Sequence, residues 1–193
     1  IPKNDKVIIW CRYVDTIKSL DEFLKKNGFI GDYIIGETPT EEIMGETERS
    51  KILKTFKNNQ ESKYLISNPI VLGESVSLHQ KCHHAIYLEM DYSAAPYFQS
   101  RDRIHRVWLD KNLKQKQYQT NYYNIISEVD ELNTIDLEIY NKVNLKIKKM
   151  LKIIEDDIPF FNDDIENTRD EIIKKIIKDY EKNRAWKINF TIK

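Results

Sequence analysis

The chain has 193 residues, of which 40% are hydrophobic and 32% charged, a length that suits one compact domain with an extension or two small domains. Lys and Arg total 31, as do Asp and Glu, and this balance excludes a basic tail or an acidic disordered segment, though not a local basic patch. The longest apolar run, Val7–Cys11, is far shorter than the roughly 18 residues of a membrane span. Two cysteines, Cys11 and Cys82, are too few for a disulfide framework, which favours a reducing, cytoplasmic location.

The start of the chain and its glycines indicate how it is organised. It opens Ile1-Pro2-Lys3, with neither an initiator Met nor a signal-peptide pattern, so we expect a piece of a longer protein. All five glycines fall between Gly28 and Gly73. Because glycine punctuates strand–turn–helix folds and its absence permits long helices, the chain divides into a strand-and-helix part followed by a helix-rich part.

Short apolar runs alternate with amphipathic patterns in the first part. In chain order we predict a strand at 6–10, a helix from 15 or 16 to 27, a strand at 33–35, a helix at 46–58, strands at 63–67 and 84–89, a helix at 94–108 and a strand at 122–127. Strands that alternate with helices imply right-handed crossovers and a mostly parallel sheet. The first part, residues 1–127, is therefore predicted to be an α/β domain with helices on both faces of an open sheet.

The remaining residues, 128–193, are predicted to form a helical extension. Residues 134–154 carry apolar side chains every three or four positions, as one long amphipathic helix does. Residues 166–186 repeat the pattern, so we expect a second helix there.

Functional chemistry is concentrated in the segment from Gln99 to Arg106 (Gln-Ser-Arg-Asp-Arg-Ile-His-Arg). On a helix, Gln99, Arg103 and Arg106 share a face because they are four and three residues apart. Two guanidinium groups and an amide on one face can bind an anion with several oxygens. The plainer alternative is a solvated basic face. The predicted helix follows a strand, so its start should lie at the carboxyl edge of the sheet, where ligands bind.

The same segment resembles motif VI of superfamily 2 helicases of the Swi/Snf type, Gln-Ala-x-x-Arg-x-x-Arg. Residues 63–78 are similar to motif V, 7–13 to motif IV, and 35–37 with Glu48-Arg49 and Phe56 to the family's Gly-x-Thr…Glu-Arg…Phe segment. The order and spacing match over residues 6–109. The chain therefore resembles the second RecA-like lobe of a Swi/Snf-type ATPase, followed by the helix that succeeds this lobe in the family.

The resemblance implies a role at an ATP site shared with another lobe. Arg103 and Arg106 would act as arginine fingers on the γ-phosphate, which can be worth roughly 10³–10⁵ in rate, and Gln99 would help position the phosphates. Gly73 and Glu74, in motif V, would lie near the nucleotide. ATP and Mg²⁺ would be bound mainly by an N-terminal RecA-like lobe of the same polypeptide.

Nucleic acid is the implied partner, with double-stranded DNA favoured. Ser67, Asn68 and Arg12 are the candidates for contacts with its phosphates. The chain has no Gly-x-x-x-x-Gly-Lys-(Ser/Thr) loop and no Asp-Glu-x-(His/Asp) strand. We therefore expect no ATP hydrolysis by this chain alone.

Departures from the family pattern indicate a remote branch. Val107-Trp108 stands where the family commonly has Gly-Gln after motif VI. Ser75 and Ser77 stand where motif V usually has Gly and Asn. It therefore stays open whether this motif couples the nucleotide site to the nucleic-acid site as it does in the family.

Two other interpretations remain open. A zinc site would use the cluster His79, Cys82, His83 and His84, but zinc ligands usually come as two separated pairs and no second pair is present. The other interpretation is a non-catalytic, helicase-like scaffold or protein-interaction module, whose long helices at 134–154 and 166–186 contact a partner.

Overall fold

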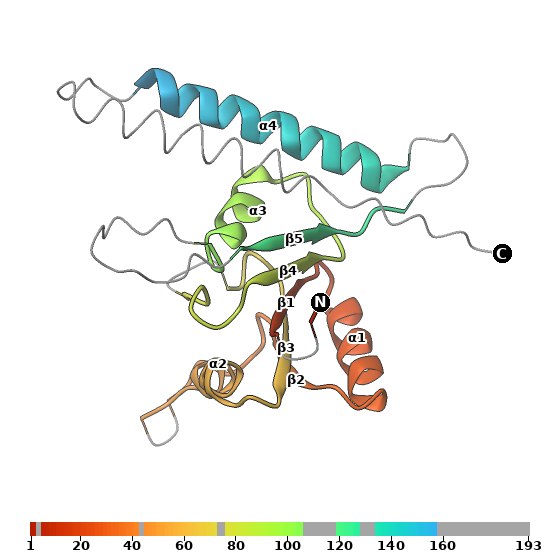
Figure 1. The fold of residues 1–193 in the computed structure, drawn as a ribbon, viewed down its shortest axis with the longest axis vertical. Helices are drawn as coiled ribbons and strands as arrows, with labels where there is room; N and C mark the ends of the chain where they lie inside the picture. The colour runs from red at the N-terminus through yellow and green to blue at the C-terminus, as the bar shows by residue number, and fades with distance from the viewer. Residues whose placement is uncertain (3–4, 43–44, 73–75, 106–118, 128–133, 158–193) are drawn as a thin grey trace.

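A computed structural model describes residues 1–2, 5–42, 45–72, 76–105, 119–127 and 134–157. In these residues five parallel strands form one sheet in the order β2-β3-β1-β4-β5, accompanied by four helices (Figure 1). The elements are β1 Val7–Trp10, α1 Val14–Lys26, β2 Ile30–Ile34, α2 Glu48–Asn58, β3 Ser62–Ser67, β4 His84–Tyr87, α3 Ala94–Arg101, β5 Asn121–Asn124 and α4 Ile135–Asp157. The predicted α/β class with a parallel sheet is confirmed.

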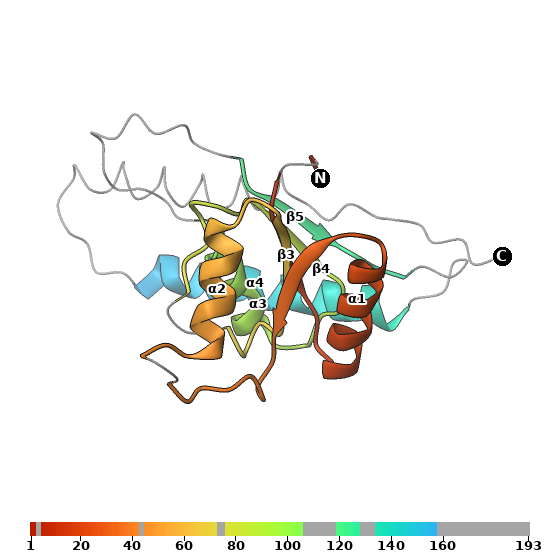
Figure 2. The same cartoon turned by 90° about the horizontal axis from the view of Figure 1, so that it is seen from below.

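The central strand β1 is covered on both faces. Ile8 and Trp10 belong to the larger hydrophobic core, and Ile9 and Cys11 to the smaller one on the opposite face. Figure 2 shows the reason, because α1 and α2 lie on opposite sides of the sheet. A strand buried on both faces needs an unbroken apolar run, since no side chain of it reaches solvent.

The helices divide unequally between the two faces. Helix α1 contributes Ile17 to the smaller core, whereas α2 contributes Ile52 and Phe56 to the larger one. Helix α4 packs against α3 and adds Ile139, Val143 and Ile147 to that larger core. The long predicted helix after the sheet is therefore present and shares the core of the sheet domain. The proposed division at residue 127 stays a prediction, and residues 166–186 lie outside the described residues.

Helix α3 ends seven residues earlier than the sequence pattern predicts, at Arg101 instead of residue 108. After Arg101 the backbone forms a tighter turn with hydrogen bonds between residues three apart. The Arg103 N–H donates to the Ser100 carbonyl and the Ile104 N–H to the Arg101 carbonyl, each at 3.3 Å. The carbonyl of Arg103 accepts the N–H of Leu78 at 2.7 Å. In a continuing helix that carbonyl would accept the N–H four residues ahead, so the contact with Leu78 replaces a helical bond.

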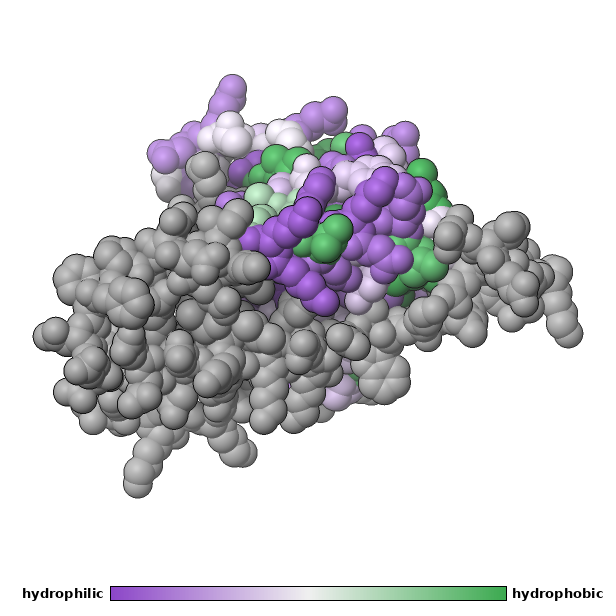
Figure 3. Space-filling view, turned by 90° about the horizontal axis from the view of Figure 1, so that it is seen from above, coloured by the Kyte–Doolittle hydropathy of each residue, from purple (hydrophilic) through white to green (hydrophobic). Residues whose placement is uncertain are grey.

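The surface seen from the α4 side is mainly hydrophilic in its described part, with hydrophobic residues scattered among the polar ones (Figure 3). Ile135 and Leu145 of α4 are among the exposed hydrophobic residues. Such scattered apolar side chains are normal for a protein surface. In the part of the chain that the structure describes, no helix is sufficiently long and apolar to cross a membrane.

Candidate functional site

The turn that carries Arg103 lies beside the segment that leads into β4. The Leu78 N–H donates to the Arg103 carbonyl, and the Leu78 carbonyl accepts the N–H groups of Lys81 and Cys82, both at 2.9 Å, shortly before β4 begins at His84. Helix α3 starts near the carboxyl edge of the sheet but runs back across it. The start of α3 thus lies where the sequence predicts it, whereas Arg103 follows the far end of this short helix, near the start of β4, and its role stays a prediction.

Tyrosines hold the last turn of α3 in place. Tyr87, fully buried, shares a hydrogen bond of 2.7 Å with the Ser100 hydroxyl. The hydroxyl of Tyr122 donates to the Arg101 carbonyl at 3.2 Å, and the Arg101 guanidinium carbon lies 4.3 Å from the centre of the Tyr122 ring. Burial raises the pKa of both tyrosines, so they remain neutral hydrogen-bonding groups. The backbone that leads to Arg103 is thus fixed from the sheet side.

The sequence predicts that Gln99 and Arg103 share a helical face, but only Gln99 lies within α3. Gln99 is exposed in the last turn of α3, whereas Arg103 is half-buried in the turn after it. Three further predicted residues, Gly73, Glu74 and Arg106, lie outside the described residues.

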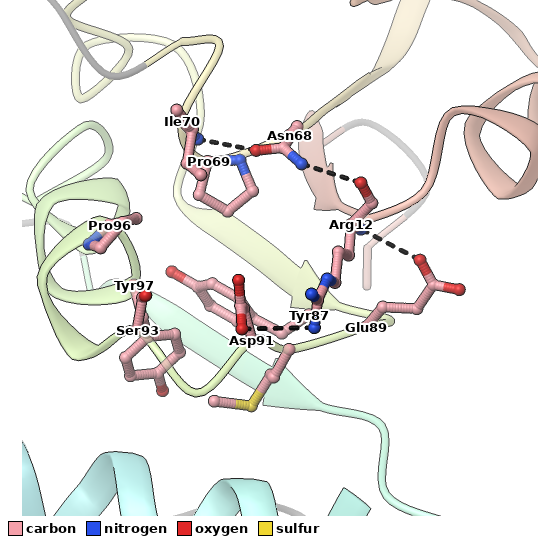
Figure 4. Close-up of a pocket in the computed structure, with 11 residues that line it drawn as sticks. Arg12, Asn68, Pro69, Ile70, Tyr87, Glu89, Asp91, Ser93, Pro96 and Tyr97 are labelled. Atoms are coloured by element: carbon pink, nitrogen blue, oxygen red, sulfur yellow. Dashed lines mark hydrogen bonds and ion pairs between the residues drawn. The ribbon is translucent and has the colours of Figure 1, made fainter.

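A second group of predicted residues meets at the carboxyl edge, where β1, β3 and β4 end (Figure 4). The N–H groups of Arg12 and Tyr13 donate to one oxygen of Glu89 at 3.0 and 3.1 Å, and the Thr16 hydroxyl donates to the other at 2.8 Å. The Asn68 amide donates to the Arg12 carbonyl at 2.8 Å. Side chains from the ends of β3 and β4 therefore fix the backbone of Arg12.

Glu89 also satisfies the beginning of α1. Tyr13 is the N-cap residue of this helix, and its own side chain makes no capping hydrogen bond. The first N–H groups of a helix have no partner within the helix, and here Glu89 accepts the N–H of the N-cap residue Tyr13 together with that of Arg12 before it. Negative charge at a helix N-terminus is also electrostatically favourable.

The Arg12 guanidinium faces Asp91. The Nη1 atom lies 3.2 Å from Oδ1 of Asp91, and the two side chains are 40% and 38% exposed. Beside this ion pair is a small hollow of about 30 Å³ between the loop at Asn68 and the start of α3 (Figure 4). The edge therefore offers an open surface for contacts and not an enclosed ligand cavity.

Of the predicted nucleic-acid contacts, the structure brings Arg12 and Asn68 together but turns Ser67 inward. Ser67 is fully buried, and its hydroxyl donates to the Ile34 carbonyl at 2.7 Å, which joins the ends of β2 and β3. This burial disfavours a contact between Ser67 and a phosphate. Sequence reasoning missed Glu89 and Asp91, although their position just after a buried strand was a signal.

The described residues do not support a zinc site, since they contain no group of three or more His, Cys, Asp and Glu side chains placed to hold a metal ion. Cys82 is buried, and its thiol contacts the carbonyls of Lys6 and His84. Burial raises its pKa to about 12, whereas a metal ligand must be a thiolate. Nε2 of His84 lies 3.0 Å from Asp5 instead.

Comparison with known proteins decides the family. Residues 1–107, more than half of the chain, match the family described as helicase conserved C-terminal domain. The chain belongs to the helicase conserved C-terminal domain family. The match includes residues 7–13, residues 63–78 and the segment from Gln99 to Arg106, which are parts that carry the motif resemblance.

A solved structure agrees with this helicase C-terminal fold. The chain is similar to the crystal structure of the C-terminal part of the Fun30 ATPase domain, with 17% sequence identity and a TM-score of 0.59, over 73% of this chain and 39% of that chain. The chain thus spans about two fifths of that structure, and an identity this low shows the fold alone. No curated protein matches the chain. The predicted resemblance to the second RecA-like lobe is confirmed at the level of family and fold.

Proposed function

We propose that this helicase C-terminal domain is the second lobe of an ATP-dependent nucleic-acid translocase of the Swi/Snf type that acts on double-stranded DNA. The observation that carries the proposal is the hydrogen bond of 2.7 Å between Leu78 and Arg103. It joins the turn of motif VI to the end of motif V. The same motif V segment passes the carboxyl edge at the end of β3, where Asn68 holds Arg12. One stretch of chain therefore contacts both the proposed nucleotide side and the proposed nucleic-acid side.

At the nucleotide side, Arg103 and Arg106 would reach the γ-phosphate of ATP bound by the N-terminal lobe, and Gln99, Gly73 and Glu74 would lie around the phosphates. A guanidinium group there stabilises the charge that develops on the transferred phosphoryl group. The described residues do not form a binding site for Mg²⁺, because they contain no group of three or more His, Cys, Asp or Glu side chains that could hold a metal ion. We therefore assign Mg²⁺ to the N-terminal lobe and derive no step through it here.

At the nucleic-acid side, Arg12 and Asn68 would contact backbone phosphates at the carboxyl edge. Such contacts carry no sequence information and release counterions, so affinity should fall steeply with salt. Both properties suit a motor that moves along DNA irrespective of sequence. A cytoplasmic location stays a prediction.

The test is ATP hydrolysis by the full-length protein, measured without nucleic acid and with a DNA duplex, single-stranded DNA or RNA at equal nucleotide concentration. We expect the duplex to stimulate hydrolysis most, and the chain of residues 1–193 alone to show none. Stimulation by RNA alone would retain the motor and correct the substrate. The absence of hydrolysis under every condition would contradict the proposal and favour the non-catalytic scaffold.

A further inference from the structure

The environment of Arg12 at the carboxyl edge goes beyond a simple phosphate contact. Its backbone is fixed on both sides, since its N–H donates to Glu89 and its carbonyl accepts the Asn68 amide. Its side chain is held differently, by the ion pair with Asp91 and by a position over the Tyr13 ring, 5.3 Å from its centre. The guanidinium can therefore change partner without disturbing the strands.

The two carboxylates near Arg12 have separate functions. Both oxygens of Glu89 are occupied by two backbone N–H groups and the Thr16 hydroxyl. Asp91 faces the guanidinium with Oδ1, which also accepts the Tyr92 N–H at 2.6 Å. Asp91 is thus the counter-charge of Arg12, held in place by the backbone that follows β4.

A carboxylate and a phosphate oxygen compete for the same donors of an arginine. We infer that Asp91 pairs with the Arg12 guanidinium where a nucleic-acid phosphate would otherwise bind. Asp91 thereby lowers the affinity of this edge for the phosphate backbone. This inference rests on the proposed function. A phosphate must displace Asp91 to reach Arg12 and must also approach its negative charge, so the aspartate weakens binding.

The size of the effect follows from the exposure of the pair. Ion pairs between side chains exposed to this degree contribute about 0.2–1 kcal/mol, which corresponds to a change in affinity of about 1.4- to 5-fold. The salt dependence should change as well. Each additional neutralised phosphate adds about −0.9 to the slope of log K against log salt concentration for duplex DNA.

The experiment measures binding of a fluorescent DNA duplex to the full-length protein by anisotropy over a range of salt concentrations. The Asp91→Asn substitution removes the charge but leaves an oxygen to accept the Tyr92 N–H. We expect it to tighten binding about two- to fivefold at low salt and to steepen the slope by about one. The Arg12→Ala substitution should weaken binding more in the Asp91→Asn background than in the natural protein.

A matched control is Glu61→Gln, which removes one exposed negative charge just before β3, at the opposite edge of the sheet. It should leave binding nearly unchanged. Equal effects of Glu61→Gln and Asp91→Asn would overturn the inference, as would unchanged or weaker binding by Asp91→Asn. If the natural protein and Asp91→Asn both fail to bind duplex, the proposed function fails with it; duplex binding without an Asp91 effect refutes this inference alone.

Discussion

At the residue scale, Glu89 joins the end of β4 to the start of α1, and its two oxygens accept three hydrogen bonds. Two of the donors are backbone N–H groups, that of the N-cap residue Tyr13 and that of Arg12 before it, and such groups are costly to leave without a partner. The residue thus combines the function of a helix cap with that of a link between the central strands. The same link sets the position of Arg12.

We expect Glu89→Ala to lower the free energy of unfolding by about 1–3 kcal/mol, because it removes a charged cap and its hydrogen bonds. Urea denaturation of the purified chain provides the measurement. Glu89→Gln keeps oxygen and loses charge, so its effect should be smaller. Equal stability of Glu89→Ala and the natural chain would show that the cap contributes nothing.

The sequence predicts the residues that carry recognisable motif chemistry but not their partners. Arg12 and Arg103 stand out because they follow a predicted strand and lie in a motif. Glu89 lies 77 residues from Arg12 in the chain, and only the pairing of β1 with β4 brings them together. Ser67 shows the same limit, since its hydroxyl is directed to β2 by a strand pairing that its own neighbours do not specify.

At the element scale, β2 pairs with β3 in parallel, with a shift of register between Ile30 and Gly31. A Cβ atom on Gly31 would lie 2.4 Å from the Tyr64 carbonyl oxygen and 2.5 Å from atoms of the Tyr64 ring. Contacts this short do not occur in folded proteins, so the strands must separate or Tyr64 must move. Tyr64 is itself held, because its hydroxyl donates to the buried Asp21 at 2.8 Å.

Gly31→Ala is therefore expected to destabilise the fold by about 1–3 kcal/mol, the usual cost of overpacking. Gly36→Ala is the matched control, because no atom lies within 4 Å of a Cβ built there. Thermal unfolding of both variants compares them directly. A Gly36→Ala variant as unstable as Gly31→Ala would contradict the steric explanation.

The central strand β1 was easier to predict than the edge strand β2, which starts three residues before the predicted 33–35, or than the end of α3. The run at 6–10 predicts β1 well because burial on both faces leaves a clear apolar signal. The pattern at 94–108 continues past the true end of α3 because local spacing contains no information about Leu78. Just after the helix ends, the Arg103 carbonyl accepts a tertiary hydrogen bond from the Leu78 N–H in place of a helical one.

At the scale of the whole molecule, the strand order explains why one segment contacts two distant sites. Strands β3 and β4 both pair with β1, one on each side. The connection between them therefore starts at the carboxyl edge, where Asn68 contacts Arg12, and enters β4 beside the Arg103 turn. Its hydrogen bond from Leu78 to the Arg103 carbonyl links this segment to the turn after α3.

The most direct test of this account measures steady-state ATP hydrolysis by the full-length protein with saturating DNA duplex. Arg103→Ala and Arg106→Ala should each lower kcat at least about a hundredfold while the KM for ATP changes little. Arg103→Lys should also be impaired, because lysine keeps the charge but not the planar fork of donors. Near-natural turnover by Arg103→Ala, with normal folding, would contradict the assignment of this lobe to the motor.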